Sequence, residues 1–137
     1  MFNKDIFKFN LINQTRLTEA FKMPILKGTS HIPKELISFN YALTCKDRKN
    51  KGVHFYIDDY QFERIWNRPY KFLQMFKDFD CVIMPDFSMY KNMPLPMQIY
   101  NSFRSKLLAS FYENNGIEVI PNLNWSDEDN SPLSRSL

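Results

Sequence analysis

The chain contains few glycines and cysteines, and their scarcity excludes several kinds of site. Only Gly28, Gly52 and Gly116 occur among 137 residues, so the glycine-rich dinucleotide-binding loop and the P-loop are both absent. Cys45 and Cys81 are far apart and show no CxxC spacing. The sequence therefore argues against a zinc site and against a disulfide scaffold.

Long apolar runs are missing as well. Lys4, Asp5 and Lys8 interrupt the apolar core that a signal peptide would need, and no run reaches the length of a membrane span. We therefore expect a cytoplasmic protein with reduced thiols and no membrane partner. With 44% hydrophobic and 16% aromatic residues, a chain of this length can form one domain with a substantial core.

The net charge of +3 is unevenly distributed along the chain. Residues 1–52 have ten basic and four acidic side chains, giving +6, and residues 53–137 have eight and eleven, giving −3. A basic first half is compatible with nucleic-acid contact, and also with a solvated lysine-rich surface. The most cationic stretch is a polar loop before Gly52, and its candidate binding residues are Lys46, Arg48, Lys49 and Lys51.

From Val53 onward, alternating strand and helix patterns predict an α/β fold. Three short apolar runs are typical of buried strands: residues 53–57, 81–84 and 117–120. Two longer segments between them, residues 62–79 and 96–114, have apolar side chains at helical spacing. Pro69 interrupts the first of them. This alternation implies right-handed crossovers and a parallel sheet. We predict a βαβαβ core over residues 53–125, either part of a barrel or an open sheet.

The first 52 residues are less regular. Residues 15–22 predict a short helix that ends at Met23-Pro24. Residues 35–44 alternate in polarity and predict a strand. We expect one domain over residues 1–130, made of this basic N-terminal segment and the βαβαβ core, followed by a flexible tail at residues 131–137.

Acidic residues follow the predicted strands at the edge where ligands bind in parallel α/β sheets. Asp58 and Asp59 follow the first strand, and Asp86 follows the second. Converging carboxylates could hold Mg²⁺ or Mn²⁺ for phosphodiester hydrolysis, or divide acid and base roles between them. An aspartate in this position also commonly caps the next helix. These three aspartates are the candidate catalytic and metal-binding residues.

Other polar and aromatic residues near this edge are candidates for binding. Asn101 and Arg104 lie one helical turn apart, away from the apolar stripe, where they could hold a phosphate or face solvent. Trp125 follows the third predicted strand and offers a stacking surface. His54 lies within a predicted buried strand and is expected to be a satisfied core residue rather than a base.

Four motifs in order resemble a known family. They are Phe55-Tyr-Ile-Asp-Asp-Tyr-Gln-Phe-Glu-Arg-Ile-Trp66, Pro85-Asp-Phe-Ser-Met-Tyr90, Met93-Pro94 with Gln98–Asn101 and Arg104, and Pro121 with Trp125. Over about residues 30–128 the chain resembles an uncharacterised family of phages, plasmids and other mobile elements, domain of unknown function 4417. The resemblance implies a cytosolic mobile-element protein without an established activity. Members of that family continue with further βα units, so we expect this chain to be shortened.

Two hypotheses of function follow. In the first, an accessory protein without a cofactor binds a host protein or a protein–nucleic-acid complex, such as a defence nuclease, and counteracts defence as an anti-CRISPR inhibitor does. Under this hypothesis Tyr90, the last residue of the second motif, is a candidate binding residue. Apolar surface left by absent strands would also favour a homodimer. In the second, a metal-dependent nuclease or phosphodiesterase uses Asp58, Asp59 and Asp86, with Arg104 on the phosphate.

Overall fold

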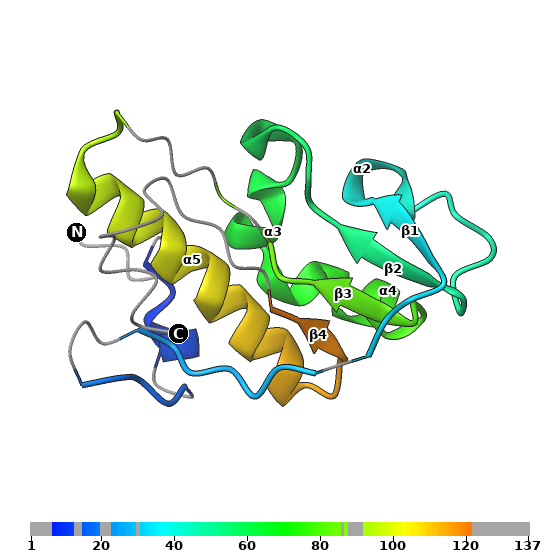
Figure 1. The fold of residues 1–137 in the computed structure, drawn as a ribbon, viewed down its shortest axis with the longest axis horizontal. Coiled ribbons are helices and arrows are strands. Elements are labelled where there is room, and N and C mark those ends of the chain that lie inside the picture. Colours follow the sequence, from blue (N-terminus) through cyan, green and yellow to red (C-terminus); the bar gives the residue numbers. More distant parts are fainter. Residues whose placement is uncertain are drawn as a thin grey trace.

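A sheet of four parallel strands, in the order β1-β2-β3-β4, forms the centre of the protein (Figure 1). This computed structural model describes residues 7–12, 15–19, 23–29, 31–85, 87 and 92–121. The strands are β1 (Glu35–Ser38), β2 (Lys51–His54), β3 (Cys81–Ile83) and β4 (Val119–Ile120). The predicted α/β class is confirmed. The sheet is open, because within the described ranges β1 and β4 each pair with a single neighbour.

One short helix precedes β1, and the other helices lie in the connections between successive strands. The helices are α1 (Phe9–Ile12), α2 (Phe39–Ala42), α3 (Glu63–Asn67), α4 (Leu73–Lys77) and α5 (Leu95–Asn114), with 3₁₀ turns η2 (Asp59–Gln61) and η3 (Pro69–Phe72). The expected interruption at Pro69 is present. It separates α3 from η3 because proline has no backbone N–H to continue the first helix.

The first part of the chain differs from the prediction in two places. The strand expected over residues 35–44 ends at Ser38, where the chain turns into α2. This turn buries Phe39 and Ala42 in the core and leaves Tyr41 exposed, which an extended strand could not do at that spacing. Residues 15–19 are not helical. Leu17 instead pairs with residue 24 in an antiparallel bridge, and Met23 is buried.

One face of the sheet carries the main core. Val53, Val82 and Val119 are aligned across neighbouring strands and belong to one hydrophobic cluster with residues of α2, α3, α4 and α5. The four helices therefore pack on the same face of the sheet. Phe76 lies at the centre of this cluster, with its ring centroid 6.1 Å from that of Phe39, 6.2 Å from Phe55 and 5.0 Å from Tyr112.

Helix α5 is buried on several sides. It lies between the sheet and the N-terminal segment in Figure 1. Glu113 near its end accepts hydrogen bonds of 2.8 Å from the backbone N–H groups of Lys27 and Gly28. Several polar residues of α5 are buried as well, including Ser102, Ser105 and Ser110. The Ser105 hydroxyl accepts a hydrogen bond from the Phe87 N–H at 3.1 Å. No helix in the described residues is long and apolar enough to cross a bilayer.

The opposite face of the sheet is closely packed at one point. Gly52 of β2 pairs with Cys81 of β3. A Cβ atom added to Gly52 would lie 2.8 Å from the Cys81 sulfur and 3.1 Å from a side-chain carbon of Pro33. Glycine is therefore needed here so that the segment preceding β1 can pack against the sheet.

We predict that Phe76→Ala lowers the free energy of unfolding by about 3–5 kcal/mol, because the truncation leaves a cavity in the aromatic core. Urea denaturation measures this change. Tyr60→Ala is the matched control, since Tyr60 is 77% exposed, and we expect it to change stability by less than about 0.5 kcal/mol. Equal effects of the two substitutions would contradict the described core.

Candidate functional site

The carboxyl edge of the sheet was the predicted site. Asp58 is exposed just before the 3₁₀ turn η2, and Asp59 begins that turn. Their backbone carbonyls accept hydrogen bonds from Gln61 (2.9 Å) and Phe62 (3.0 Å), so both residues take part in the turn that leaves β2. Asp86, Tyr90 and Trp125 lie outside the described residues, as does the predicted tail. The convergence of the three aspartates therefore stays a prediction.

His54 also lies at this edge and is structurally satisfied. Its Nδ1 accepts a hydrogen bond from the Tyr56 N–H (3.2 Å), and its ring stacks on that of Tyr56 at 5.3 Å. Partial burial lowers the pKa of His54 from 6.5. The hydrogen bond requires an unprotonated Nδ1 and therefore also favours the neutral ring. The expectation that His54 is not a general base stays a prediction.

We predict that His54 destabilises the fold in acid. Because its pKa is lower in the folded state than the unfolded value of 6.5, stability falls as the pH decreases from 6.5 toward the folded-state pKa and is unaffected by this group above pH 6.5. NMR titration measures the pKa directly. The same spectra contain a comparison, because a hydrogen bond with Asp80 raises the pKa of His31. A higher pKa for His54 than for His31 would contradict this description.

Arg104 is buried between helices instead of facing solvent. Its guanidinium forms an ion pair with Glu63 of α3 and donates to the Asn101 side-chain oxygen at 2.8 Å. It also lies 3.9 Å from the centroid of the Phe87 ring and 5.6 Å from that of Trp66. The predicted proximity of Asn101 and Arg104 is present. In this arrangement Arg104 joins α5 to α3, with its charge compensated by Glu63.

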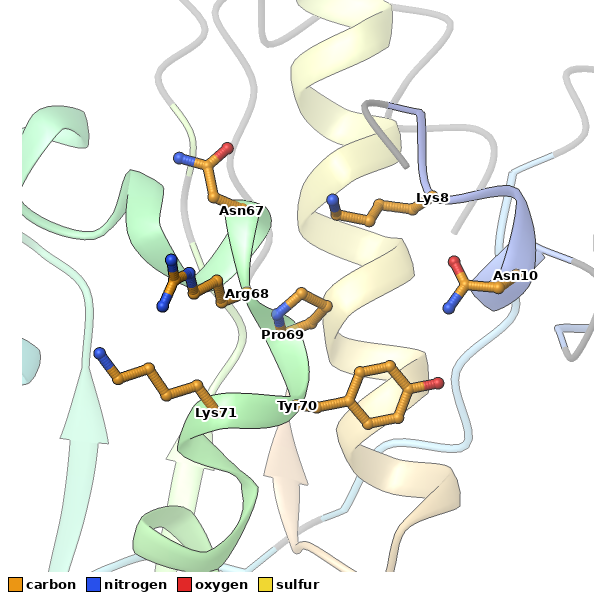
Figure 2. A pocket seen from close by; sticks show the side chains of 7 residues that line it. All are labelled: Lys8, Asn10, Asn67, Arg68, Pro69, Tyr70 and Lys71. Atoms are coloured by element: carbon orange, nitrogen blue, oxygen red, sulfur yellow. The ribbon is translucent and has the colours of Figure 1, made fainter. Parts of the chain in front are cut away.

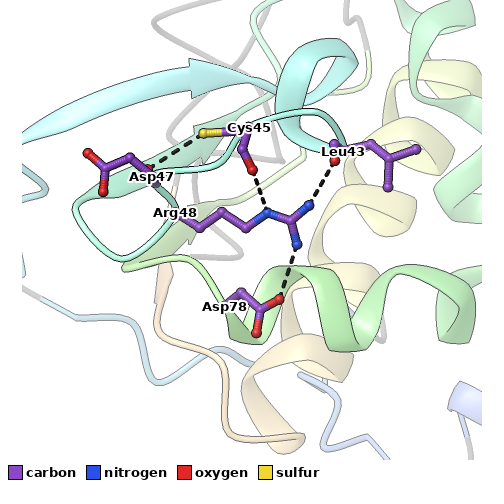
Figure 3. A network of polar contacts seen from close by, with 5 residues as sticks. All are labelled: Leu43, Cys45, Asp47, Arg48 and Asp78. Carbon is purple, nitrogen blue, oxygen red and sulfur yellow. Dashed lines mark hydrogen bonds and ion pairs between the residues drawn. The ribbon is translucent and has the colours of Figure 1, made fainter.

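The polar loop of residues 46–51 contains cations that are bonded within the fold and cations that are exposed to solvent. Figure 3 shows Arg48 donating to the carbonyls of Cys45 and Leu43, both at 2.8 Å, and to the Asp78 carboxylate at 3.1 Å. These contacts connect the end of α2, the loop and the end of α4. Lys51 lies 3.9 Å from Glu35. Arg48 and Lys51 therefore hold the loop in place, whereas Lys46 and Lys49 are exposed.

Lys46 and Lys49 line a hollow that we call the loop pocket. Its volume is about 580 Å³, and Lys77 at the end of α4 lies on its other side, with Asp78 and Asp80. Both carboxylates already have partners, since Asp78 is paired with Arg48 and Asp80 with His31. The exposed charge of this pocket is therefore mainly positive.

A second hollow, the helix pocket, lies at the turn between α3 and η3. Its volume is about 380 Å³, and it contains three cations and no carboxylate: it is lined by Lys8, Asn10, Asn67, Arg68, Pro69, Tyr70 and Lys71. Figure 2 shows Arg68 and Lys71 extending to the same side, while the Tyr70 ring points toward the N-terminal segment. Cations, amides and an aromatic ring suit an anionic ligand.

Residues 68–80 join the two pockets. We call the exposed cations along this path the basic strip: Lys46, Lys49, Arg68, Lys71 and Lys77. None of them forms an ion pair with another described residue, whereas Glu63, Asp78 and Asp80 are paired. Asp47, next to Lys46, is exposed and accepts a hydrogen bond from Asn50 at 3.4 Å. The helical part of the strip was not predicted from the sequence. The spacing of Arg64, Arg68 and Lys71, opposite the apolar stripe at roughly the helical period, is the signal that could have indicated it.

The fold and this surface define an open parallel α/β protein with a cationic helical side. Residues 15–133 match the family described as Domain of unknown function (DUF4417), and the chain belongs to this family, as its motifs predicted. It is similar to the Gene 1 protein of Mycobacterium phage L5, with 35% identity over 132 residues. It is also similar to the Gene 1 protein of Mycobacterium phage D29, with 30% identity over 128 residues.

Both matches cover 89% of this chain, but 56% of the L5 protein and 47% of the D29 protein. The chain thus spans about half the length of the curated relatives it matches. No solved structure matches it. The chain is a relative of phage-encoded proteins whose names state no activity.

Proposed function

We propose that the chain is an accessory protein of phage type that binds single-stranded nucleic acid through the basic strip. The observation that carries this proposal is the unequal pairing of charges around residues 68–80. Asp78 and Asp80 in this segment are paired with Arg48 and His31, and Glu63 of α3 is paired with Arg104, which leaves Asp47 as the carboxylate of the adjoining loop without an ion pair in the described residues. The cations of the strip have no such partners in the described residues, so they are available to phosphate groups.

The strip has enough cations for several phosphates. It contains five of them, and Arg68, Lys71 and Lys77 lie on one continuous stretch of the chain. Each phosphate that a lysine or arginine neutralises releases a counterion, and this release supplies the binding free energy.

Tyr70 favours a single strand over a duplex. Tyr70 is 52% exposed and lines the helix pocket, with its ring on the side that faces the N-terminal segment, away from the Arg68 and Lys71 side chains. An edge-to-face contact with Phe111, at 4.9 Å between centroids, fixes its orientation. Aromatic rings beside a cationic groove stack on unpaired bases, which a duplex keeps inside its own stack.

A nucleic acid held by a host protein complex presents the same phosphates and bases. The proposal therefore includes an anti-CRISPR-like role, in which the chain occupies the nucleic acid of a host defence nuclease and inhibits it. Such a complex could be bound through its nucleic acid or through its protein. Pull-down from host lysate, with and without prior nuclease treatment, distinguishes these two contacts. Host protein that is retained after nuclease treatment would indicate a direct protein interface instead of contact through nucleic acid.

We predict that the triple substitution Arg68→Gln, Lys71→Gln, Lys77→Gln reduces the salt dependence of binding. The slope of log K against log salt should decrease in magnitude by about 2, since each lost contact with a single strand contributes about 0.7. Fluorescence anisotropy with labelled poly(dT) and poly(U) over a salt series measures the slope.

The matched control neutralises three exposed cations that line neither pocket: Arg16, Lys27 and Lys34. Each triple variant lowers the formal net charge from +3 to zero, so a general charge effect would change both equally. An equal slope for the two variants, or no binding by the unmodified chain, would refute the proposal.

We predict that Tyr70→Leu weakens binding of a single strand by about 1–3 kcal/mol, because stacking is lost. Tyr70→Phe should bind as the unmodified chain does, since it keeps the ring and its contact with Phe111. The comparison of leucine with phenylalanine separates stacking from simple apolar burial. Similar affinities for the two variants would exclude a stacking role for Tyr70.

A further inference from the structure

Three side chains with metal-binding atoms meet at the amino edge of the sheet, opposite the predicted site. Asp80 and Cys81 lie at the start of β3, and His31 comes from the segment before β1. The His31 Nε2 is 2.7 Å from an Asp80 carboxylate oxygen. The ligand atoms of all three residues lie within 4.8 Å of one another, and no other such group of three occurs in the described residues.

The fold brings these residues together from distant parts of the sequence. Gly52 leaves room for the Cys81 sulfur and for Pro33, which lies two positions after His31 and packs against the same point of the sheet. The negative charge of Glu118, next to β4, acts on both His31 and Cys81. The group is therefore formed by the start of β3, by the segment before β1 and by the space that Gly52 of β2 leaves.

The donor atoms have the chemistry of a transition-metal site. Imidazole nitrogen, carboxylate oxygen and thiolate sulfur are the three protein ligands of zinc, with bonds of about 2.0–2.3 Å. In a tetrahedral site, ligand atoms at these bond lengths lie roughly 3.3–3.8 Å apart. The observed separations of 2.7 Å and up to 4.8 Å lie on either side of this range. A small rotation of the half-exposed His31 and Asp80 side chains would equalise them.

We propose that His31, Asp80 and Cys81 bind a thiophilic divalent transition-metal ion, with the fourth position taken by water. Binding replaces the thiol proton of Cys81 with the ion and releases that proton to solvent. It also replaces the hydrogen bond between His31 and Asp80 with two bonds to the metal. The site is independent of the proposed nucleic-acid function, because none of its ligands belongs to the basic strip.

Titration of the untagged, reduced full chain with Co²⁺ tests this site. We expect a thiolate-to-cobalt charge-transfer band in the near ultraviolet that saturates at one equivalent and is removed by Zn²⁺. Cys81→Ser should abolish the band. Cys45→Ser should leave it unchanged, because Cys45 lies elsewhere and its sulfur is 3.8 Å from the Lys51 ammonium.

The histidines provide a second comparison that does not disturb the buried cysteine. His31 is exposed, so His31→Gln should fold normally and weaken the affinity for Co²⁺ about tenfold or more, whereas His54→Gln should bind as tightly as the unmodified chain. Absence of the band in the unmodified chain would overturn the proposal. So would a band that persists in Cys81→Ser, or equal affinities for His31→Gln and His54→Gln.

Discussion

Aromatic packing between the sheet and its helices is the constraint on which the rest of the structure depends. The strands have only two to four residues each, so backbone hydrogen bonds between them provide little order alone. Phe39, Phe55 and Phe76 are each at most 1% exposed, and burying such a side chain contributes about 1.5–3 kcal/mol. Their contacts fix α2 and α4 against β2 and thereby determine which helix surfaces face outward.

On the outward helix surfaces, the carboxylates are mostly held in ion pairs and the lysines are not. Arg48 and Arg104 are used inside the fold, where they compensate Asp78 and Glu63. Each pair compensates the charge of one partly exposed carboxylate, and the lysines on the same side have no equivalent partners in the described residues. A chain with a modest net charge can in this way present a strongly cationic side. Net charge alone would not have predicted such a surface.

Local patterns predicted most of the α/β architecture. The helix expected over residues 96–114 spans Leu95–Asn114, and the expected strands correspond to β2, β3 and β4, because helical and strand periods are properties of consecutive residues. The end of β1 was not predicted. Phe39 continues the alternation of the strand, and only its place beside Phe55 and Phe76 shows that the chain must turn there.

The functional groups were harder to predict than the elements that carry them. His31 is 49 positions from Asp80, and only the parallel alignment of β1, β2 and β3 brings the two together. The roles of Arg48 and Lys51 likewise depend on Asp78 and Glu35, which are distant or unremarkable in the sequence. Charge composition identified the loop as cationic, and the tertiary contacts then separated its structural cations from its exposed ones.

Asp80 couples the proposed metal site to the proposed nucleic-acid surface through its charge, although the two functions can be tested separately. It lines the loop pocket and is also one of the three candidate metal ligands. With no ion, its negative charge is opposed by His31 and partly offsets the nearby Lys46, Lys49 and Lys77. A bound divalent ion would add two positive charges at this edge, which strengthens the attraction for phosphate at distances within the Debye length of about 8–10 Å. Phosphate contacts and metal coordination nonetheless use different side chains, so the loss of one does not require the loss of the other.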